Sequence, residues 1–286
     1  MKKSALCLAA VLLLASVCLP FAAAEDELSL ERRFAAPCGF SRSIILPTGK
    51  TVYYYAQNDP MWSNLYFESG DSSKRRIFGD GGCGPTATAM ALRQVLTDEE
   101  LTAFGTCRKR DFSLCACSIN VGKCTKSHLR YYITSASDYA KFLPLIVADF
   151  ACGNNTFGIV SRSEAKGTTL NFYDAFPKMF NIELAKTEKF SEAEAALNKG
   201  CGIVIYTASG GPFTNTGHYM FLADADEEFV YVLDPLCRTS YSATDSKHIV
   251  HVLDTGLVAV KRSDIGGAAF WSYTIISRPG QLTAGE

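Results

Sequence analysis

A single cysteine set among glycines, directly before a helical segment, is the feature that most constrains the fold of this chain. Residues 81–86 read Gly-Gly-Cys-Gly-Pro-Thr, and residues 87–96 are mostly good helix formers with apolar side chains at helical spacing. Pro85 suits a first helical turn, where its missing N–H costs nothing. The pattern therefore predicts a helix that begins at Cys83 and ends near Leu96.

A cysteine at the N-terminus of a helix is well placed to act as a nucleophile. The unpaired backbone amides and the helix dipole there favour a thiolate over a thiol. Glycines on both sides of Cys83 leave room for the backbone of a substrate. Enzymes commonly build a nucleophilic cysteine in this way, although a buried or disulfide-bonded cysteine fits the motif as well.

A second segment predicts a β-hairpin that brings a histidine and an aspartate together. Residues 216–223 and 229–233 are expected to be strands, joined by the polar turn 226–228. His218 lies near the start of the first strand and Asp234 at the end of the second, so antiparallel pairing places them side by side. An imidazole oriented by a carboxylate is the second half of a Cys-His-Asp triad.

Two other histidines and two other aspartates are alternatives for these positions. His248 and His251 are three residues apart, so a strand would point them to opposite faces. Neither is followed by a strand that ends in Asp-Pro. Asp224 and Asp226 lie at the far end of the first hairpin strand from its histidine. The residues at the open end of the hairpin therefore remain the predicted pair.

The order of helical and extended segments predicts the fold class. Thr97-x-x-Glu100 and Ser191-x-x-Glu194 read as capping boxes that open further helices, and Gly200 is expected to close the second of these. Helices come first and strands later, which predicts an α+β fold with an antiparallel sheet. Outside the hairpin, strands are predicted at residues 43–47, 51–56, 202–207, 248–253, 257–261 and 270–277.

These segments, in this order, resemble the C39-like cysteine peptidases. This papain-like family is related to the peptidase domain of bacteriocin-processing transporters. The resemblance runs from about Tyr53 to about Pro235. Its blocks are Gln-Asn-Asp-Pro-Met-Trp at 57–62, Gly-Cys-Gly-Pro-Thr at 82–86, and Gly-His-Tyr at 217–219 followed by Val-Leu-Asp-Pro at 232–235.

The resemblance implies both a fold and a set of roles. It implies a papain-like fold whose nucleophile helix packs on an antiparallel sheet. Cys83 would be the nucleophile, His218 the general base and acid, and Asp234 the residue that orients the histidine. Gln57 would donate its amide N–H to the oxyanion, a contact that typically stabilises the tetrahedral intermediate by about 2.7–4 kcal/mol. The backbone N–H of Cys83 is the natural second donor.

The function expected from these roles is hydrolysis of a peptide or other amide bond in a peptide or protein substrate. The chemistry needs no cofactor and no metal ion. One alternative keeps the triad but passes the acyl group to an amine, as a transglutaminase-like acyltransferase does. Another is a non-catalytic binding module on a peptidase fold. The presence of all four catalytic residue types argues against this second alternative.

Charge and hydropathy exclude several other classes of protein. The chain has 28 Lys and Arg residues against 29 Asp and Glu residues, a formal net charge of −1. The two signs are interspersed along the chain. This balance argues against a dedicated nucleic-acid or membrane-surface binder. Beyond the leader described next, no stretch is apolar and long enough to span a membrane.

The first residues predict an export signal. Residues 1–24 begin with two lysines, continue with the apolar stretch 5–19 and end in three alanines. We expect cleavage after these alanines and a secreted, extracellular location, with association to the cell surface left open. Residues 25–52 are expected to form an N-terminal extension, and residues 53–280 one peptidase domain.

The cysteine count predicts disulfide bonds. Of eleven cysteines, two lie in the leader, which leaves an odd number that fits one free nucleophile. Exported proteins can form disulfides, and a polar cysteine-rich loop gains most from them. A zinc site is the alternative, but the cysteine spacings do not match paired zinc knuckles. The cysteines expected to be mainly disulfide-bonded are Cys38, Cys107, Cys115, Cys117, Cys124, Cys152, Cys201 and Cys237.

Overall fold

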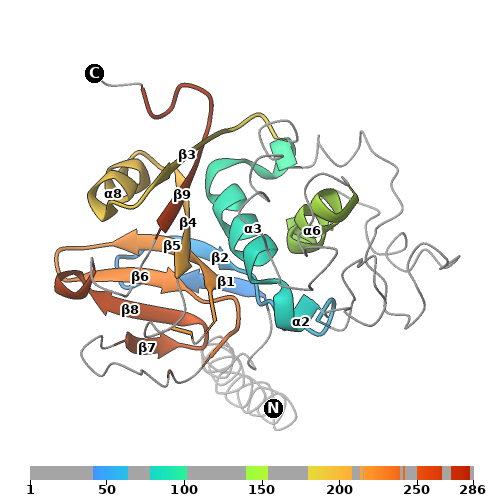
Figure 1. Cartoon of the computed structure of the whole chain (residues 1–286), viewed down its shortest axis with the longest axis horizontal. Coiled ribbons are helices and arrows are strands. Elements are labelled where there is room, and N and C mark those ends of the chain that lie inside the picture. The colour runs from blue at the N-terminus through green and yellow to red at the C-terminus, as the bar shows by residue number, and fades with distance from the viewer. Residues whose placement is uncertain are drawn as a thin grey trace, which may run out of the picture. The chain divides into compact units, whose positions relative to one another are not determined.

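A seven-stranded antiparallel sheet is the central element of this computed structural model (Figure 1). Its strand order is β3-β9-β4-β5-β6-β8-β7, and every neighbouring pair runs antiparallel. The predicted α+β class with an antiparallel sheet is therefore confirmed. The strands are β3 (Glu183–Thr187), β4 (Gly202–Thr207), β5 (His218–Ala225), β6 (Phe229–Leu233), β7 (Val250–Asp254), β8 (Leu257–Lys261) and β9 (Ser272–Ser277).

The structure describes most of the region that carries the predicted motifs. The polar loop from Cys107 to Cys124 and His248 lie outside the described residues. The described residues are 41–63, 78–101, 140–153, 180–207, 213–214, 216–238, 241, 250–265 and 272–283.

A separate two-stranded hairpin precedes the sheet in the chain. It pairs β1 (Arg42–Ile45) with β2 (Thr51–Tyr54) around a turn that contains Gly49. Gly49 has a φ of +84°, a conformation that a glycine adopts without strain. The hairpin buries Ile44 and Val52 in the same cluster as the helix that begins at Cys83. These strands overlap the predicted ones, and each ends two residues earlier than predicted.

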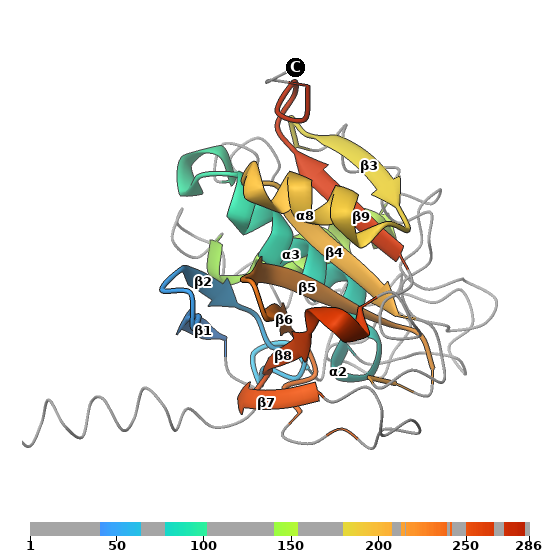
Figure 2. The same ribbon diagram turned by 90° about the vertical axis from the view of Figure 1, so that its left-hand side faces the viewer.

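Helices cover both faces of the sheet. The helix α3 (Cys83–Val95) contacts β4, β5 and β9 on one face, and α8 (Phe190–Asn198) contacts β4 and β9. Figure 2 shows α8 and α3 on opposite sides of β4. Alternate side chains of β5 enter different clusters, since Phe221 packs with α3 and Met220 packs with α8. Other helical elements among the described residues include α2 (Phe78–Gly81), α6 (Leu143–Gly153) and the short 3-10 helix η4 (Arg262–Asp264).

The helix α3 begins at Cys83, as predicted, but it is buried around most of its circumference. It contacts the sheet, strand β2 and the helix α6. Its approach to β4 is very close, because a Cβ atom added at Gly202 would lie 2.3 Å from the carbonyl oxygen of Ala91. Among the described helices, none has the length and apolar character needed to cross a bilayer.

One of the two predicted capping boxes is formed. The backbone N–H of Thr97 donates to Glu100 Oε2 at 2.8 Å, and the N–H of Glu100 donates to Thr97 Oγ1 at 3.3 Å. This reciprocal pair satisfies two amides that a helix start leaves without partners.

The second predicted capping box is wrong. The helix α8 begins at Phe190, one residue before Ser191, and Thr187 Oγ1 accepts the bond from the N–H of the residue before the helix. Glu194 does not turn back to the helix start, because it pairs with the Arg262 guanidinium, with Oε2 2.8 Å from Nη2. A distant ion pair has thus taken the glutamate that the local pattern assigned to a cap.

Candidate active site

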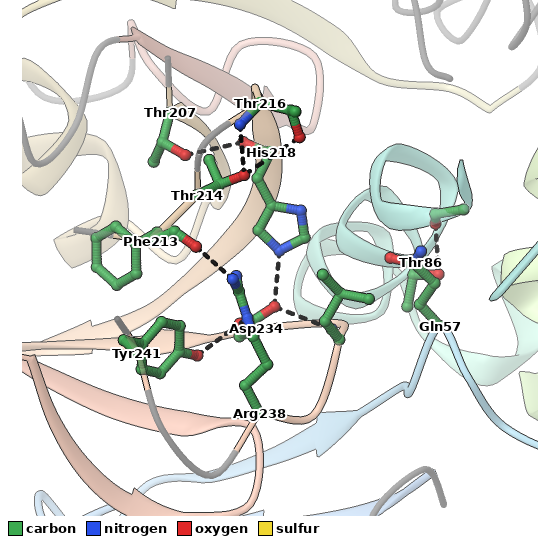
Figure 3. A network of polar contacts seen from close by, with 12 residues as sticks. Gln57, Thr86, Thr207, Phe213, Thr214, Thr216, His218, Asp234, Arg238 and Tyr241 are labelled. Atoms are coloured by element: carbon green, nitrogen blue, oxygen red, sulfur yellow. Dashed lines mark hydrogen bonds and ion pairs between the residues drawn. The ribbon is translucent and has the colours of Figure 1, made fainter. Parts of the chain in front are cut away.

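The start of α3 and the open end of the β5–β6 hairpin lie far apart in the chain but meet at one end of the sheet. Cys83 is the first residue of α3, His218 is the first residue of β5, and Asp234 directly follows β6. His218 Nε2 lies 2.7 Å from Asp234 Oδ1, and only 3% of His218 and none of Asp234 is exposed to solvent. Figure 3 shows this bond, with the second ring nitrogen of His218 turned toward α3. The structure therefore brings the predicted histidine, aspartate and cysteine together.

The Cys83 sulfur lies among hydrogen-bond donors. His218 bonds to it, as do the backbone N–H groups of Tyr219 and Gly84. Because Asp234 occupies Nε2 of the imidazole, Nδ1 is the nitrogen that is left to face the sulfur. Cys83 as a whole residue is partly exposed to solvent.

The electrostatics of the three groups favour an ion pair between sulfur and imidazole. Burial raises the pKa of Cys83, but the bond and charge of His218 and the two backbone N–H groups outweigh this and lower it. Burial lowers the pKa of His218, but the charge and hydrogen bond of Asp234 and the contact with Cys83 outweigh it and raise the pKa to about 9. Both shifts favour a thiolate beside an imidazolium over a neutral thiol beside a neutral imidazole.

Asp234 accepts hydrogen bonds from several donors besides His218. Oδ1 also accepts the backbone N–H of Leu236 at 2.9 Å. Oδ2 accepts Arg238 Nε at 2.8 Å and the Tyr241 hydroxyl at 2.5 Å. Burial raises the pKa of Asp234, but His218, Arg238 and Tyr241 together bring it well below its usual range. Sequence reasoning missed Arg238 and Tyr241, because nothing in their spacing marks them as partners of a carboxylate.

Gln57 lies beside α2 with its amide already oriented. Its Nε2 donates to the carbonyl oxygen of Gly79 at 2.6 Å, and only 1% of the residue is exposed. An amide nitrogen carries two N–H groups, so one remains for another acceptor. The backbone N–H of Gln57 donates to the carbonyl oxygen of Pro235 at 2.7 Å. This bond ties Gln57 to the residue that follows Asp234.

The rest of the N-terminal block supports this placement of Gln57. Trp62 is buried and its Nε1 donates to the carbonyl oxygen of Ala56 at 2.9 Å. Asp59 is also buried, and its Oδ2 accepts both the N–H and the hydroxyl of Ser41 at 3.0 Å. The aspartate and tryptophan of the block therefore shape the loop that carries Gln57.

The glycines next to the site serve packing more directly than substrate access. A Cβ atom added at Gly82 would lie 2.4 Å from the ring of Phe78. One added at Gly217 would lie 2.3 Å from the Tyr206 hydroxyl. The sequence explained the glycine before Cys83 by room for a substrate. The structure shows that Phe78 already fills this space.

The alternative residues lie elsewhere. His251 is on the edge strand β7, where its ring packs edge-on against Phe229 at 5.7 Å between centroids. His248 is outside the described residues. Asp224 accepts a hydrogen bond from the Thr48 hydroxyl, and Asp226 accepts one from the Tyr231 hydroxyl.

Two cysteines that were expected to form disulfides are thiols. Cys201 is buried at the start of β4, and Cys237 is buried close to Tyr54, to which it is hydrogen-bonded. For these two residues the disulfide prediction is wrong. The other predicted disulfide cysteines fall outside the side chains that the structure describes. Within the described part of the chain, no cluster of side chains could hold a metal ion.

The family model described as Peptidase_C39 like family matches residues 50–251, which is most of the chain. This range contains Gln57, Cys83, His218 and Asp234. No curated protein sequence gives a significant match.

Proposed function

Because the chain belongs to the Peptidase_C39 like family and has its papain-like α+β fold, we propose that it is a cysteine hydrolase that cleaves a peptide or other amide bond. The observation that carries the proposal is the hydrogen-bonded series from Asp234 through His218 to Cys83, in which the aspartate and the histidine are buried. In this series the pKa of the thiol is lowered and that of the imidazole is raised. These are the shifts that a nucleophile and its proton carrier need.

In the proposed mechanism the Cys83 thiolate attacks the carbonyl carbon of the scissile amide. A carbon–sulfur bond forms, and the carbonyl oxygen becomes an oxyanion. Gln57 donates one Nε2–H to this oxygen, with the Cys83 backbone N–H as the second donor. The bond from Gln57 to the Gly79 carbonyl holds the amide in place beforehand, so little reorganisation is needed.

His218 then transfers its Nδ1 proton to the leaving amine, and the carbon–nitrogen bond breaks to leave a thioester on Cys83. In the second half, His218 takes a proton from water, and the resulting hydroxide attacks the thioester. The carbon–sulfur bond breaks, the acid product leaves, and the thiolate–imidazolium pair is restored. Asp234 keeps the imidazole oriented through Nε2 in both halves.

The test is hydrolysis of a peptide library by the protein under reducing conditions, with Cys83→Ala as the inactive comparison. We expect Cys83→Ala to abolish cleavage and Cys201→Ala to leave it unchanged. Iodoacetamide should label Cys83 before any other thiol. Unchanged cleavage by Cys83→Ala would end this proposal. Products that form only when an amine is added would point to acyl transfer, and a Cys83 that does not react with iodoacetamide would point to a binding module.

We further propose that the chain is exported after cleavage behind Ala24. The support for this is the leader pattern of residues 1–24. N-terminal sequencing of the protein recovered outside expressing cells should begin at Glu25. Recovery of only the uncleaved chain inside the cells would contradict the proposal.

A further inference from the structure

We infer that Arg238 and Tyr241 are positioning residues that hold the buried Asp234 carboxylate in position to hydrogen-bond with His218. The carboxylate has two oxygens with separate sets of partners. Oδ1 receives the imidazole and the Leu236 N–H, while Oδ2 receives Arg238 Nε and the Tyr241 hydroxyl. Figure 3 shows Arg238 and Tyr241 approaching Asp234 from the side away from α3.

Arg238 also reaches the segment that leads to His218. Its Nη1 donates to the carbonyl oxygen of Phe213. The guanidinium carbon lies 4.6 Å from the centroid of the Tyr241 ring, and that ring meets the Phe213 ring edge-on at 5.7 Å. Phe213, Arg238 and Tyr241 therefore form one connected unit, which we name the clamp. The clamp joins the chain before His218 to the chain after Asp234.

A buried carboxylate needs such support. Asp234 has no exposed surface, and an ionised group in that position is costly unless it is paired and hydrogen-bonded. In the ion-pair state, formal charges alternate in sign along the series Arg238, Asp234, His218 and Cys83. With Arg238 included, the net charge of these four side chains is zero. Without Arg238 the same state would carry a net negative charge in a buried site.

Two tyrosines that contact Asp234 stay protonated near neutral pH. The Tyr54 hydroxyl donates to the carbonyl oxygen of Asp234 at 2.8 Å, and the Cys237 thiol is bonded to the same tyrosine. Burial raises the pKa of Tyr54 and of Tyr241 well above its usual range. Arg238 is thus the cation of the segment after β6 that balances the carboxylate.

The charge of Arg238 has a predictable effect on proton binding at the site. When the positive charge of Arg238 is removed, it no longer offsets the negative charge of Asp234 that acts on His218 and Cys83. The imidazolium is then stabilised and the thiolate is destabilised, so both proton dissociations move to higher pH. A substitution that merely loosened the fold would lower the reactivity without moving both steps in this direction.

The experiment measures alkylation of Cys83 by iodoacetamide against pH, quantified by mass spectrometry of its peptide. For Arg238→Gln we expect both steps to rise by about one pH unit, with Arg238→Lys close to wild type because it keeps the charge. Arg262→Gln is the matched control, because this partly exposed arginine binds a carboxylate far from the site. We expect it to leave the profile unchanged.

The clamp should also affect turnover, a part of the inference that rests on the proposed function. In metal sites, residues that hydrogen-bond to a ligand and orient it typically contribute 10- to 100-fold to activity. We expect Arg238→Gln to lower kcat by about that factor.

If the alkylation profile of Arg238→Gln shows both steps at the same pH as the wild type, the inference is overturned, whether or not the protein hydrolyses amides. If Arg238→Gln fails to fold, Tyr241→Phe provides the test. Loss of the Tyr241 hydroxyl donor should also raise the pH of the second step, at which the His218 imidazolium loses its proton. An unchanged profile in Tyr241→Phe would then refute the clamp.

Discussion

Replacing Asp234 by asparagine should separate the charge of this residue from its orienting role. The amide oxygen of asparagine can take the place of Oδ1 and still accept from His218 and from the Leu236 N–H. The amide NH2 then faces Arg238 where a carboxylate oxygen stood. The imidazole keeps a partner on Nε2 but loses the negative charge beside it.

The size of the effect follows from the pKa of His218. Burial lowers this pKa, and the charge and bond of Asp234 with the contact to Cys83 raise it to about 9. The difference from the ordinary value of about 6.5 corresponds to about 3 kcal/mol. Because the folded-state pKa lies above the ordinary one, the protonated ring persists at neutral pH and is lost as the pH rises through about 9. In Asp234→Asn, burial remains and the charge is gone, so we expect the pKa to fall to about 6.5 or below.

The assay is again alkylation of Cys83 against pH, which needs no substrate. The wild type should begin to react below the ordinary thiol pKa and show a second rise near pH 9, when the imidazolium loses its proton. Asp234→Asn should lose the step near pH 9 and react mainly near the ordinary thiol pKa of about 8.5. Asp224→Asn, which alters a carboxylate bound to the Thr48 hydroxyl, should match the wild type. A step that stays near pH 9 in Asp234→Asn would refute the reasoning.

Three further changes test other parts of the structure. Gln57→Ala should lower kcat on a cleaved peptide by about 100-fold with little change in KM, because the contact strengthens only in the transition state; a raised KM at constant kcat would contradict this. Gly202→Ala should destabilise the fold by about 1–3 kcal/mol or more in urea unfolding, since its Cβ would lie 2.3 Å from α3 backbone. Gly280→Ala is the control, because its site has open space and only a φ of +75° to strain it. Thr97→Ala should cost about 1 kcal/mol in the same assay by removing the formed capping box; no change would show that the box does not stabilise the helix start.

Several features follow directly from local sequence. The helix start at Cys83 and the capping box at Thr97 depend on backbone rules that act over a few residues, and both are found where they were predicted. The hairpin from His218 to Asp234 is similarly local. The short turn between its strands favours antiparallel pairing, and this pairing brings the two side chains together.

Other features depend on contacts between distant segments. Strand β3 was not predicted, because Glu183–Thr187 has weak strand propensity and forms a strand by pairing with β9 at the edge of the sheet. The failed capping box at Ser191 has the same origin, since its glutamate is drawn to the distant Arg262. Local propensity carries no information about such partners.

In the candidate site, too, some features follow from local sequence and others depend on tertiary contacts. Sequence alone indicated the residue types, since a cysteine before a helix and a histidine opposite an aspartate can be read from short motifs. Tertiary structure decided how they are arranged: Asp234 binds Nε2 of His218, Arg238 and Tyr241 hold the carboxylate, and the Gly79 carbonyl orients Gln57. The physical reason is that each of these bonds depends on atoms brought into reach by packing of the sheet, the loops and the helices. Hydrogen bonds form or fail over tenths of an ångström, a scale that only the folded chain sets.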